Sequence, residues 1–284
     1  MTVPFALFAA ALAIAATVFA CGTVSDGNGG DADKATLTVF AAASLAESLR
    51  ALGAAFEAAN PGVRVAFNFA GSQTLRTQLE HGASADVFAS ADWRQMVAVK
   101  EAGLLGSAPQ CFAANRLTVA APAGSDAVQS LHDLATPGVT IALAAAEVPA
   151  GAYARDTLGL LSADAGFPDG FADAALSNVV TNEANVRGVA QKVALGEVDA
   201  GIVYETDAKA AQYAGAVRVV EIPEQFNPAA KYPIAALAGG RLETALAFIG
   251  FVQGHNGQAI LREHGFAPPA TAAYPCQASE ASGG

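Results

Sequence analysis

Apolar positions along residues 36–266 follow two patterns, short β-prone runs and longer segments with helical periodicity. The predicted strands are residues 37–41, 63–69, 86–90, 117–121, 140–143, 179–180, 201–204, 217–222 and 234–237. The predicted helices are residues 44–60, 71–82, 92–102, 151–161, 186–195, 241–253 and 256–264, with a loop at 162–175. Strands that alternate with crossover helices predict an α/β fold with mostly parallel sheets.

The N-terminal segment has a different pattern, because residues 4–20 are continuously apolar and residues 1–20 carry no charged side chain. Such a stretch is typical of a signal peptide and is short for a membrane span. The last residues, Val-Phe-Ala-Cys21, resemble a bacterial lipoprotein signal. We expect a signal peptide over 1–20, a lipidated Cys21 and a flexible tether over 21–35, which would anchor the protein on the extracytoplasmic face of the cell membrane. A plain signal peptide or an uncleaved anchor is the alternative.

The chain contains three cysteines. Lipidation of Cys21 would leave Cys111 and Cys276 in an oxidising compartment, where we expect them to form one disulfide. Two separate thiols are the alternative, since the sequence does not show that their Cα atoms are close. The bond would pin the C-terminal end to the body and leave residues 277–284 as a tail. No CxxC or His/Cys spacing indicates zinc, and we expect neither a cofactor nor cation ligands.

Charge and composition exclude several classes of protein. The chain has 15 Lys and Arg against 26 Asp and Glu, so its formal net charge is −11. It has no basic run, which argues against nucleic acid and anionic lipid surfaces as partners. A hydrophobic content of 53% argues against disorder, and 284 residues can bury the core of two domains. The acidity suggests cationic partners only weakly, because net charge acts over long distances and is screened by salt.

Small or hydroxyl residues stand at four predicted helix starts. They are Ser44, Ser72, Pro149-Ala-Gly151 and Asn185-Val-Arg187. In α/β folds, ligands bind at the carboxyl ends of strands, where the unpaired first N–H groups of helices favour anions. Tyr204 at the end of a strand would add a neutral donor. Taken alone, a Ser at such a start is more often a plain N-cap, and Ser44 with Glu47 matches a capping box.

Six motifs, in order over residues 37–266, resemble those of the periplasmic molybdate-binding proteins of molybdate ABC transporters. They are Val39-Phe-Ala-Ala-Ala-Ser-Leu45, Phe69-Ala-Gly-Ser-Gln-Thr-Leu75, Gly82-Ala-Ser-Ala-Asp-Val-Phe-Ala-Ser-Ala91, Val148-Pro-Ala-Gly-Ala-Tyr-Ala154, Asn185-Val-Arg-Gly188 and Gly201-Ile-Val-Tyr-Glu-Thr-Asp207. The resemblance implies a type II periplasmic binding protein fold, in which two lobes joined by two crossover strands close over the ligand. We expect the crossovers near Val119 and Val220. Lobe 1 would hold residues 36–117 and 222–276, and lobe 2 residues 118–221.

The resemblance also implies the ligand contacts. Ser44 and Ser72 would donate from their hydroxyl and backbone N–H groups, Ala150 and Val186 from their backbone N–H groups, and Tyr204 from its phenol. Molybdate is a dianion without a proton at neutral pH, so it only accepts hydrogen bonds and suits a site made of donors. Tungstate has nearly the same size and should bind as well. The implied partner is the membrane permease of an ABC transporter, and we expect a monomer.

Two positions depart from the family pattern. Gln73 stands where a Ser is often found. Glu47 lies one turn into the helix that Ser44 begins, where it either reaches back to its own cap or faces the ligand. A carboxylate that faced a dianion would lower the affinity.

Other functions remain open at the level of sequence. The same fold could bind sulfate, phosphate or ferric iron, although none of the five positions is acidic and iron would require a partner for Tyr204, such as Tyr153. A purely structural lipoprotein would not explain the six motifs. A serine hydrolase is remote, because the chain has no GxSxG motif and no histidine neighbours a Ser motif, so we expect no enzyme. The four histidines are His81, His132, His255 and His264.

Overall fold

The computed structural model describes residues 34–269, so the predictions for Cys21, Cys276 and the segments 1–33 and 270–284 lie outside the described residues. Within them the chain forms two five-stranded sheets. The strands are β1 (Ala35–Ala42), β2 (Val63–Ala70), β3 (Val87–Ala89), β4 (Gln110–Asn115), β5 (Leu117–Pro122), β6 (Ile141–Ala144), β7 (Val179–Glu183), β8 (Ala200–Tyr204), β9 (Val217–Glu221) and β10 (Ala230–Ala236).

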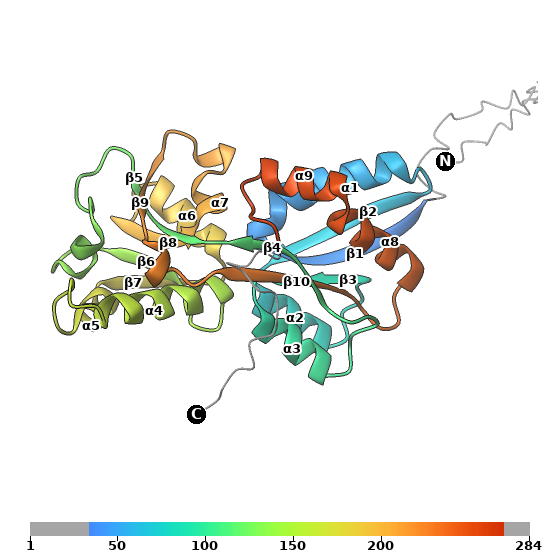
Figure 1. Cartoon of the computed structure of the whole chain (residues 1–284), viewed down its shortest axis with the longest axis horizontal. Helices are drawn as coiled ribbons and strands as arrows, with labels where there is room; N and C mark the ends of the chain where they lie inside the picture. The colour runs from blue at the N-terminus through green and yellow to red at the C-terminus, as the bar shows by residue number, and fades with distance from the viewer. Residues whose placement is uncertain (1–33, 270–284) are drawn as a thin grey trace, which may run out of the picture. The chain divides into compact units, whose positions relative to one another are not determined.

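The first sheet has the order β2-β1-β3-β10-β4 and the second has the order β7-β6-β8-β5-β9 (Figure 1). Both sheets are mixed. β1 pairs in parallel with β2 and β3, and β6 in parallel with β7 and β8, whereas β10 and β5 pair antiparallel with their neighbours. The chain passes to the second sheet between β4 and β5 and returns between β9 and β10. Val119 and Val220, near which we expected the crossovers, are register partners in β5 and β9.

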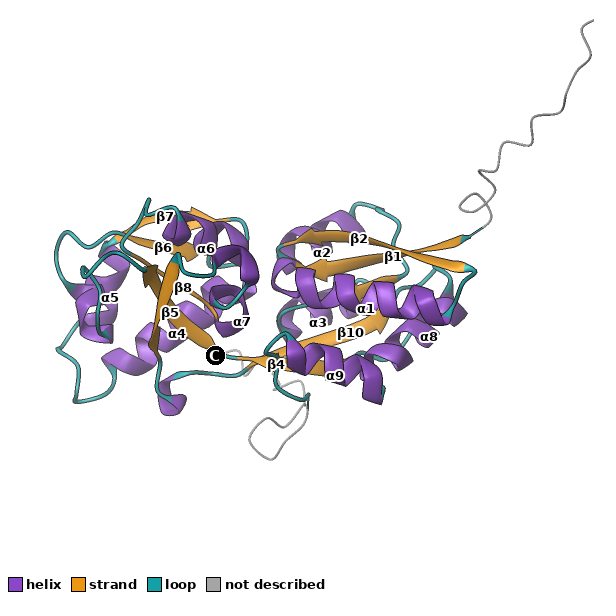
Figure 2. Cartoon of the chain, turned by 90° about the horizontal axis from the view of Figure 1, so that it is seen from above, coloured by secondary structure: helices purple, strands orange, loops and turns teal. Residues whose placement is uncertain are grey.

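Helices cover both faces of each sheet (Figure 2). They are α1 (Ala46–Ala59), α2 (Ser72–Glu80), α3 (Trp93–Glu101), α4 (Pro149–Ser162), α5 (Phe171–Ser177), α6 (Val186–Ala194), α7 (Glu205–Ala208), α8 (Leu242–Gln253) and α9 (His255–Glu263), with 3-10 turns η1 (Ala43–Leu45), η2 (Leu131–Ala135), η3 (Ala211–Tyr213) and η4 (Glu224–Phe226). We call each sheet with its helices a lobe. In the first lobe α1, α8 and α9 lie on one face and α2 and α3 on the other. In the second lobe α6 and α7 lie opposite α4 and α5.

The central strands are apolar throughout because helices cover them on both sides. Every residue of β3, β6 and β8 is buried. This is the expected pattern for parallel strands between two helical layers, and it explains why these strands lack an alternating pattern. No helix within residues 34–269 is long and apolar enough to cross a membrane.

Three of the differences from the prediction have a clear cause. β4 was not predicted, because only Arg116 separates it from β5 and no turn residue marks the boundary. β10 begins at Ala230 rather than at residue 234. Pro233 obscured its start, since proline is rare inside strands, and it lies where the register between β10 and β4 shifts. The expected loop at 162–175 is wrong in part, because α5 forms there with Phe171 and Ala175 buried one turn apart.

Candidate functional site

The five residues expected to bind an anion, Ser44, Ser72, Ala150, Val186 and Tyr204, all line one cavity. The lining atoms lie close together and enclose a small cavity of about 10 Å³. The first two residues belong to the first lobe and the other three to the second. The remaining lining residues are Ala42, Ala43, Gly71, Ala91, Val148, Pro149 and Asn185. The anion cavity, as we call it, therefore lies between the lobes and has no charged side chain in its lining.

Three helices begin at the anion cavity. Ser72 is the first residue of α2, Val186 is the first residue of α6, and Ala150 follows Pro149 at the start of α4. Proline has no N–H group, so Ala150 carries the first N–H of its helix. N–H groups in the first turn of a helix have no acceptor within it and carry a partial positive charge. Backbone donors from both lobes thus meet at the cavity, where a dianion would be stabilised.

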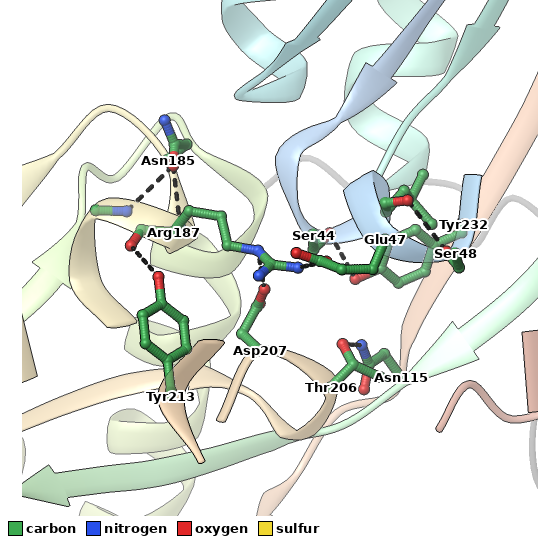
Figure 3. A network of polar contacts seen from close by, with 12 residues as sticks. Ser44, Glu47, Ser48, Asn115, Asn185, Arg187, Thr206, Asp207, Tyr213 and Tyr232 are labelled. Atoms are coloured by element: carbon green, nitrogen blue, oxygen red, sulfur yellow. Dashed lines mark hydrogen bonds and ion pairs between the residues drawn. The ribbon is translucent and has the colours of Figure 1, made fainter. Parts of the chain in front are cut away.

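The side chain of Asn185 orients the start of α6. Its Oδ1 accepts hydrogen bonds from the backbone N–H groups of Arg187 at 3.0 Å and Gly188 at 3.2 Å (Figure 3). This cap satisfies the second and third N–H groups of the helix. It does not involve the N–H of Val186, which therefore stays available to the cavity.

Two serine hydroxyls at the anion cavity are oriented by hydrogen bonds to other groups. The Oγ of Ser72 accepts the backbone N–H of Ala91 at 3.0 Å, so its O–H can donate elsewhere. The Oγ of Ser44 lies 3.2 Å from the Oη of the buried Tyr232 (Figure 3). When the Tyr232 phenol donates in this pair, Ser44 keeps its own proton for the cavity.

The phenol of Tyr204 is buried at the cavity, with 1% of the residue exposed. Its Oη has no hydrogen-bond partner among residues 34–269. A buried hydroxyl without a partner costs free energy, which an oxygen atom of a ligand would recover. Burial also raises the pKa of Tyr204 well above its usual value, so the phenol stays protonated and acts as a donor.

An iron site has little support at this position. Burial raises the pKa of Tyr153 as well, which disfavours the phenolate that ferric iron would bind, and Tyr153 does not line the cavity. Within the described part of the chain, no group of three or more His, Cys, Asp or Glu side chains could hold a metal ion.

The expected capping box of Ser44 and Glu47 is wrong. The 3-10 turn η1 precedes α1, so Ser44 lies inside a continuous helical segment and not at its edge, and no side chain caps α1. Ser44 pairs with Tyr232 instead. Glu47 neither reaches back to its own cap nor lines the anion cavity, since it forms an ion pair with Arg187 of the second lobe.

Side chains join the lobes around the anion cavity. Gln73 donates from Nε2 to the carbonyl oxygen of Ala184 at 2.9 Å, and Gln95 donates from Nε2 to that of Glu147 at 3.3 Å. Gly71 lies so close to Ala184 that an added Cβ would be 2.5 Å from its carbonyl oxygen. The Gln at position 73, a departure from the family pattern, thus takes part in contact between the lobes.

Comparisons with known proteins identify the family. Residues 37–267 match the bacterial extracellular solute-binding protein family. The molybdate-binding protein ModA of Mycobacterium tuberculosis is 38% identical over 265 residues, which cover 90% of this chain and 95% of that protein. The chain belongs to the ModA family of bacterial extracellular solute-binding proteins. Members bind a solute and are not enzymes, which confirms that prediction and rejects the serine hydrolase.

Solved structures confirm the predicted type II periplasmic binding protein fold. The periplasmic molybdate-binding protein of Azotobacter vinelandii superposes with a TM-score of 0.70 at 21% identity, over 82% of this chain and 100% of that one. The sulfate-binding protein SubI of Mycobacterium tuberculosis gives 0.73 at 22% identity, over 84% and 88%. At these identities the likeness shows the fold alone, so the choice of anion depends on the cavity and on the closer relatives.

Proposed function

We propose that this protein captures molybdate in the anion cavity, through the N–H and hydroxyl groups of Ser44, Ser72, Ala150, Val186 and Tyr204. The proposal rests above all on the convergence of neutral donors from both lobes on a cavity without a charged side chain. A fully deprotonated tetrahedral dianion accepts hydrogen bonds at every oxygen, and it would satisfy the buried phenol of Tyr204. The relatives that are named molybdate-binding proteins support this choice of oxyanion.

Other oxyanions differ from molybdate in size or in protonation. Tungstate has the same charge and nearly the same size, so the same donors bind it. Sulfate is equally free of protons, and only the size of the cavity separates it from molybdate. Hydrogen phosphate carries a proton and requires an acceptor, and no carboxylate lines the cavity.

Thermal unfolding with each anion in turn tests this proposal. A ligand at 100 times its dissociation constant stabilises a protein by about 2.7 kcal/mol, which raises the midpoint by about 5–10 °C for a chain of this size. We expect molybdate and tungstate to raise the midpoint, and sulfate and phosphate to leave it unchanged at the same concentration. A shift with sulfate or phosphate alone would show that the ligand assignment is wrong.

We also propose that lobe 1 comprises residues 36–117 and 222–276, that lobe 2 comprises residues 118–221, and that the loaded protein delivers its anion to an ABC permease. The sheets support the division, since β4 and β10 lie in the first sheet and β5 and β9 in the second. Delivery is tested with the permease in vesicles, where the loaded protein should stimulate ATP hydrolysis and a Ser72→Ala variant should do so less. Equal stimulation without molybdate would contradict delivery.

We further propose that Cys21 carries a lipid, that Cys111 pairs with Cys276, and that the protein is a monomer. Cys111 is disulfide-bonded in the structure, and Cys276 is the one cysteine left once Cys21 is lipidated. Mass spectrometry of the membrane-extracted protein tests both assignments. We expect a lipid mass that Cys21→Ser removes, a Cys111–Cys276 peptide that reduction separates, and the mass of one chain in light scattering.

A further inference from the structure

Arg187 connects the two lobes beside the anion cavity. It extends from the first turn of α6 to the carboxylate of Glu47 on α1, so this ion pair joins the second lobe to the first (Figure 3). Its Nε also lies 2.7 Å from Oδ1 of Asp207, which follows β8 in its own lobe. The Arg187–Glu47 pair can exist only while the lobes are together, whereas the Arg187–Asp207 pair does not depend on the first lobe.

This ion-pair network lies next to the anion donors without belonging to them. Arg187 follows Val186, and Glu47 lies three residues after Ser44, so the pair connects the two chain segments that carry donors of opposite lobes. Neither charged side chain lines the anion cavity. They line an adjoining cavity of about 350 Å³, together with Ser44 and residues of α7 and α9. The network therefore acts on the position of the donors and not on the anion directly.

Arg187 is also the partner of a buried acidic side chain beside the anion cavity. Asp207 is fully buried, and its carboxylate oxygens have no hydrogen bond to another side chain in the described region, so Arg187 is its charge partner. Without Arg187, the Glu47 carboxylate would stand unpaired beside a bound dianion, and the buried Asp207 would lose its charge partner. Removing one partner of a buried pair leaves an uncompensated charge, which is costly.

We propose that Arg187 is a positioning residue that holds the lobes together around the oxyanion and neutralises the Glu47 carboxylate beside it, and that it thereby sets the rate at which the oxyanion leaves. Asp207 fixes the guanidinium within the second lobe, and Glu47 binds it when the lobes meet. A pre-oriented arginine loses little conformational freedom on pairing, which strengthens the contact. The inference rests on the proposed function only in that an oxyanion occupies the anion cavity.

The variant Glu47→Gln tests the proposal, because it removes the pairing charge in the first lobe and retains the Arg187–Asp207 pair. Radiolabelled molybdate is bound, then chased with unlabelled molybdate to give the dissociation rate, and association is measured by mixing. We expect dissociation to be about tenfold faster with association changed less than about twofold, since variants of one interface differ mostly in dissociation. The matched control is Lys192→Met, which removes a cation from the same helix that pairs within its own lobe.

The dependence of the dissociation rate on salt distinguishes this role from a merely structural one. Glu47 is partly exposed, so added sodium chloride screens its attraction to Arg187. Dissociation from the wild type should accelerate with salt, whereas dissociation from Glu47→Gln should depend on salt much less. A dissociation rate of Glu47→Gln within about twofold of the wild type, in a protein with an unchanged melting midpoint, would overturn the proposal.

A wrong ligand assignment can be distinguished from a wrong proposal about Arg187. If sulfate but not molybdate stabilises the wild type, the ligand assignment is wrong, and the same rates are measured with labelled sulfate. If no oxyanion stabilises it, the proposed function fails, and small-angle X-ray scattering compares the ligand-free proteins. A larger radius of gyration for Glu47→Gln than for wild type and Lys192→Met would then support the contact between lobes, and equal radii would reject it.

Discussion

The two adjoining cavities between the lobes use opposite chemistry. The anion cavity contains only neutral residues, and its donors are helix N–H groups and hydroxyls. The neighbouring cavity contains Arg187, Glu47, Lys209 and Glu263. We interpret this difference as a division of labour, in which neutral dipoles bind the dianion and a charged network controls the contact between the lobes. A charged residue on the dianion itself would bind more strongly but would also slow release.

The largest effect should come from preventing contact between the lobes. In Gly71→Ala, the new Cβ would lie 2.5 Å from the carbonyl oxygen of Ala184, so the lobes could not meet as they do here. We expect the affinity for molybdate to fall by about 100-fold or more, since most donors of the second lobe would be displaced. Titration calorimetry measures it. Gly62→Ala is the control, because its Cβ would meet no atom within 4 Å and should leave binding unchanged.

The next largest effect should come from a single donor of the anion cavity. Tyr204→Phe removes one hydrogen bond to a charged ligand, so we expect the affinity to fall by about 10- to 100-fold. The ligand-free protein should be as stable as wild type or more so, because the variant removes a buried hydroxyl that has no partner in residues 34–269. Calorimetric titration measures the affinity, and thermal unfolding of the same sample measures the stability. Unchanged affinity would remove Tyr204 from the site.

Ser72→Ala sharpens this contrast between donors. The hydroxyl of Ser72 also accepts the N–H of Ala91, so its loss leaves a buried backbone group unpaired. We expect lower affinity together with a loss of about 1–3 kcal/mol in the free energy of unfolding. Denaturant unfolding measures the stability. A variant that is as stable as wild type and binds equally well would contradict both functions given to this hydroxyl.

The charged network predicts a dependence of stability on pH. Burial raises the pKa of Asp207 to about 7, although the Arg187 guanidinium opposes the shift. Between about pH 4 and pH 7 the folded state retains a proton that the unfolded state has lost, so this group makes stability fall as the pH rises, by up to about 1.4 kcal/mol per unit. Asp207→Asn should lack this slope in denaturant titrations at several pH values. Equal slopes in the two proteins would contradict the raised pKa.

The smallest effect should come from a residue that acts through a donor. Tyr232→Phe leaves Ser44 in place but removes the phenol that orients its hydroxyl. We expect a loss of affinity of about threefold to tenfold, because one neutral hydrogen bond contributes about 1 kcal/mol. Titration with molybdate measures the loss. An effect as large as that of Tyr204→Phe would indicate that Tyr232 contacts the anion itself.

Local features of the sequence predicted the residues of the anion cavity. Contacts between residues that are far apart in the sequence could not be predicted from it. Strand ends and helix starts are encoded within a few residues, so all five residues to which the motifs pointed line the cavity. Side-chain partners depend on tertiary packing. Tyr232 is 188 residues from Ser44, and Arg187 is 140 residues from Glu47. Glu47 was expected either to reach back to its own cap or to face the ligand, and neither expectation included the distant Arg187 with which it pairs.

The most direct test is a crystal structure with tungstate, recorded with X-rays at the tungsten absorption edge. The anomalous signal locates the metal atom without reference to the protein model. We predict one peak in the anion cavity, with the tungstate oxygens within about 3.2 Å of the Ser72 hydroxyl, the Tyr204 phenol and the N–H groups of Ala150 and Val186. A peak beside Arg187 or Lys209 in the adjoining cavity, with none among the neutral donors, would contradict the account.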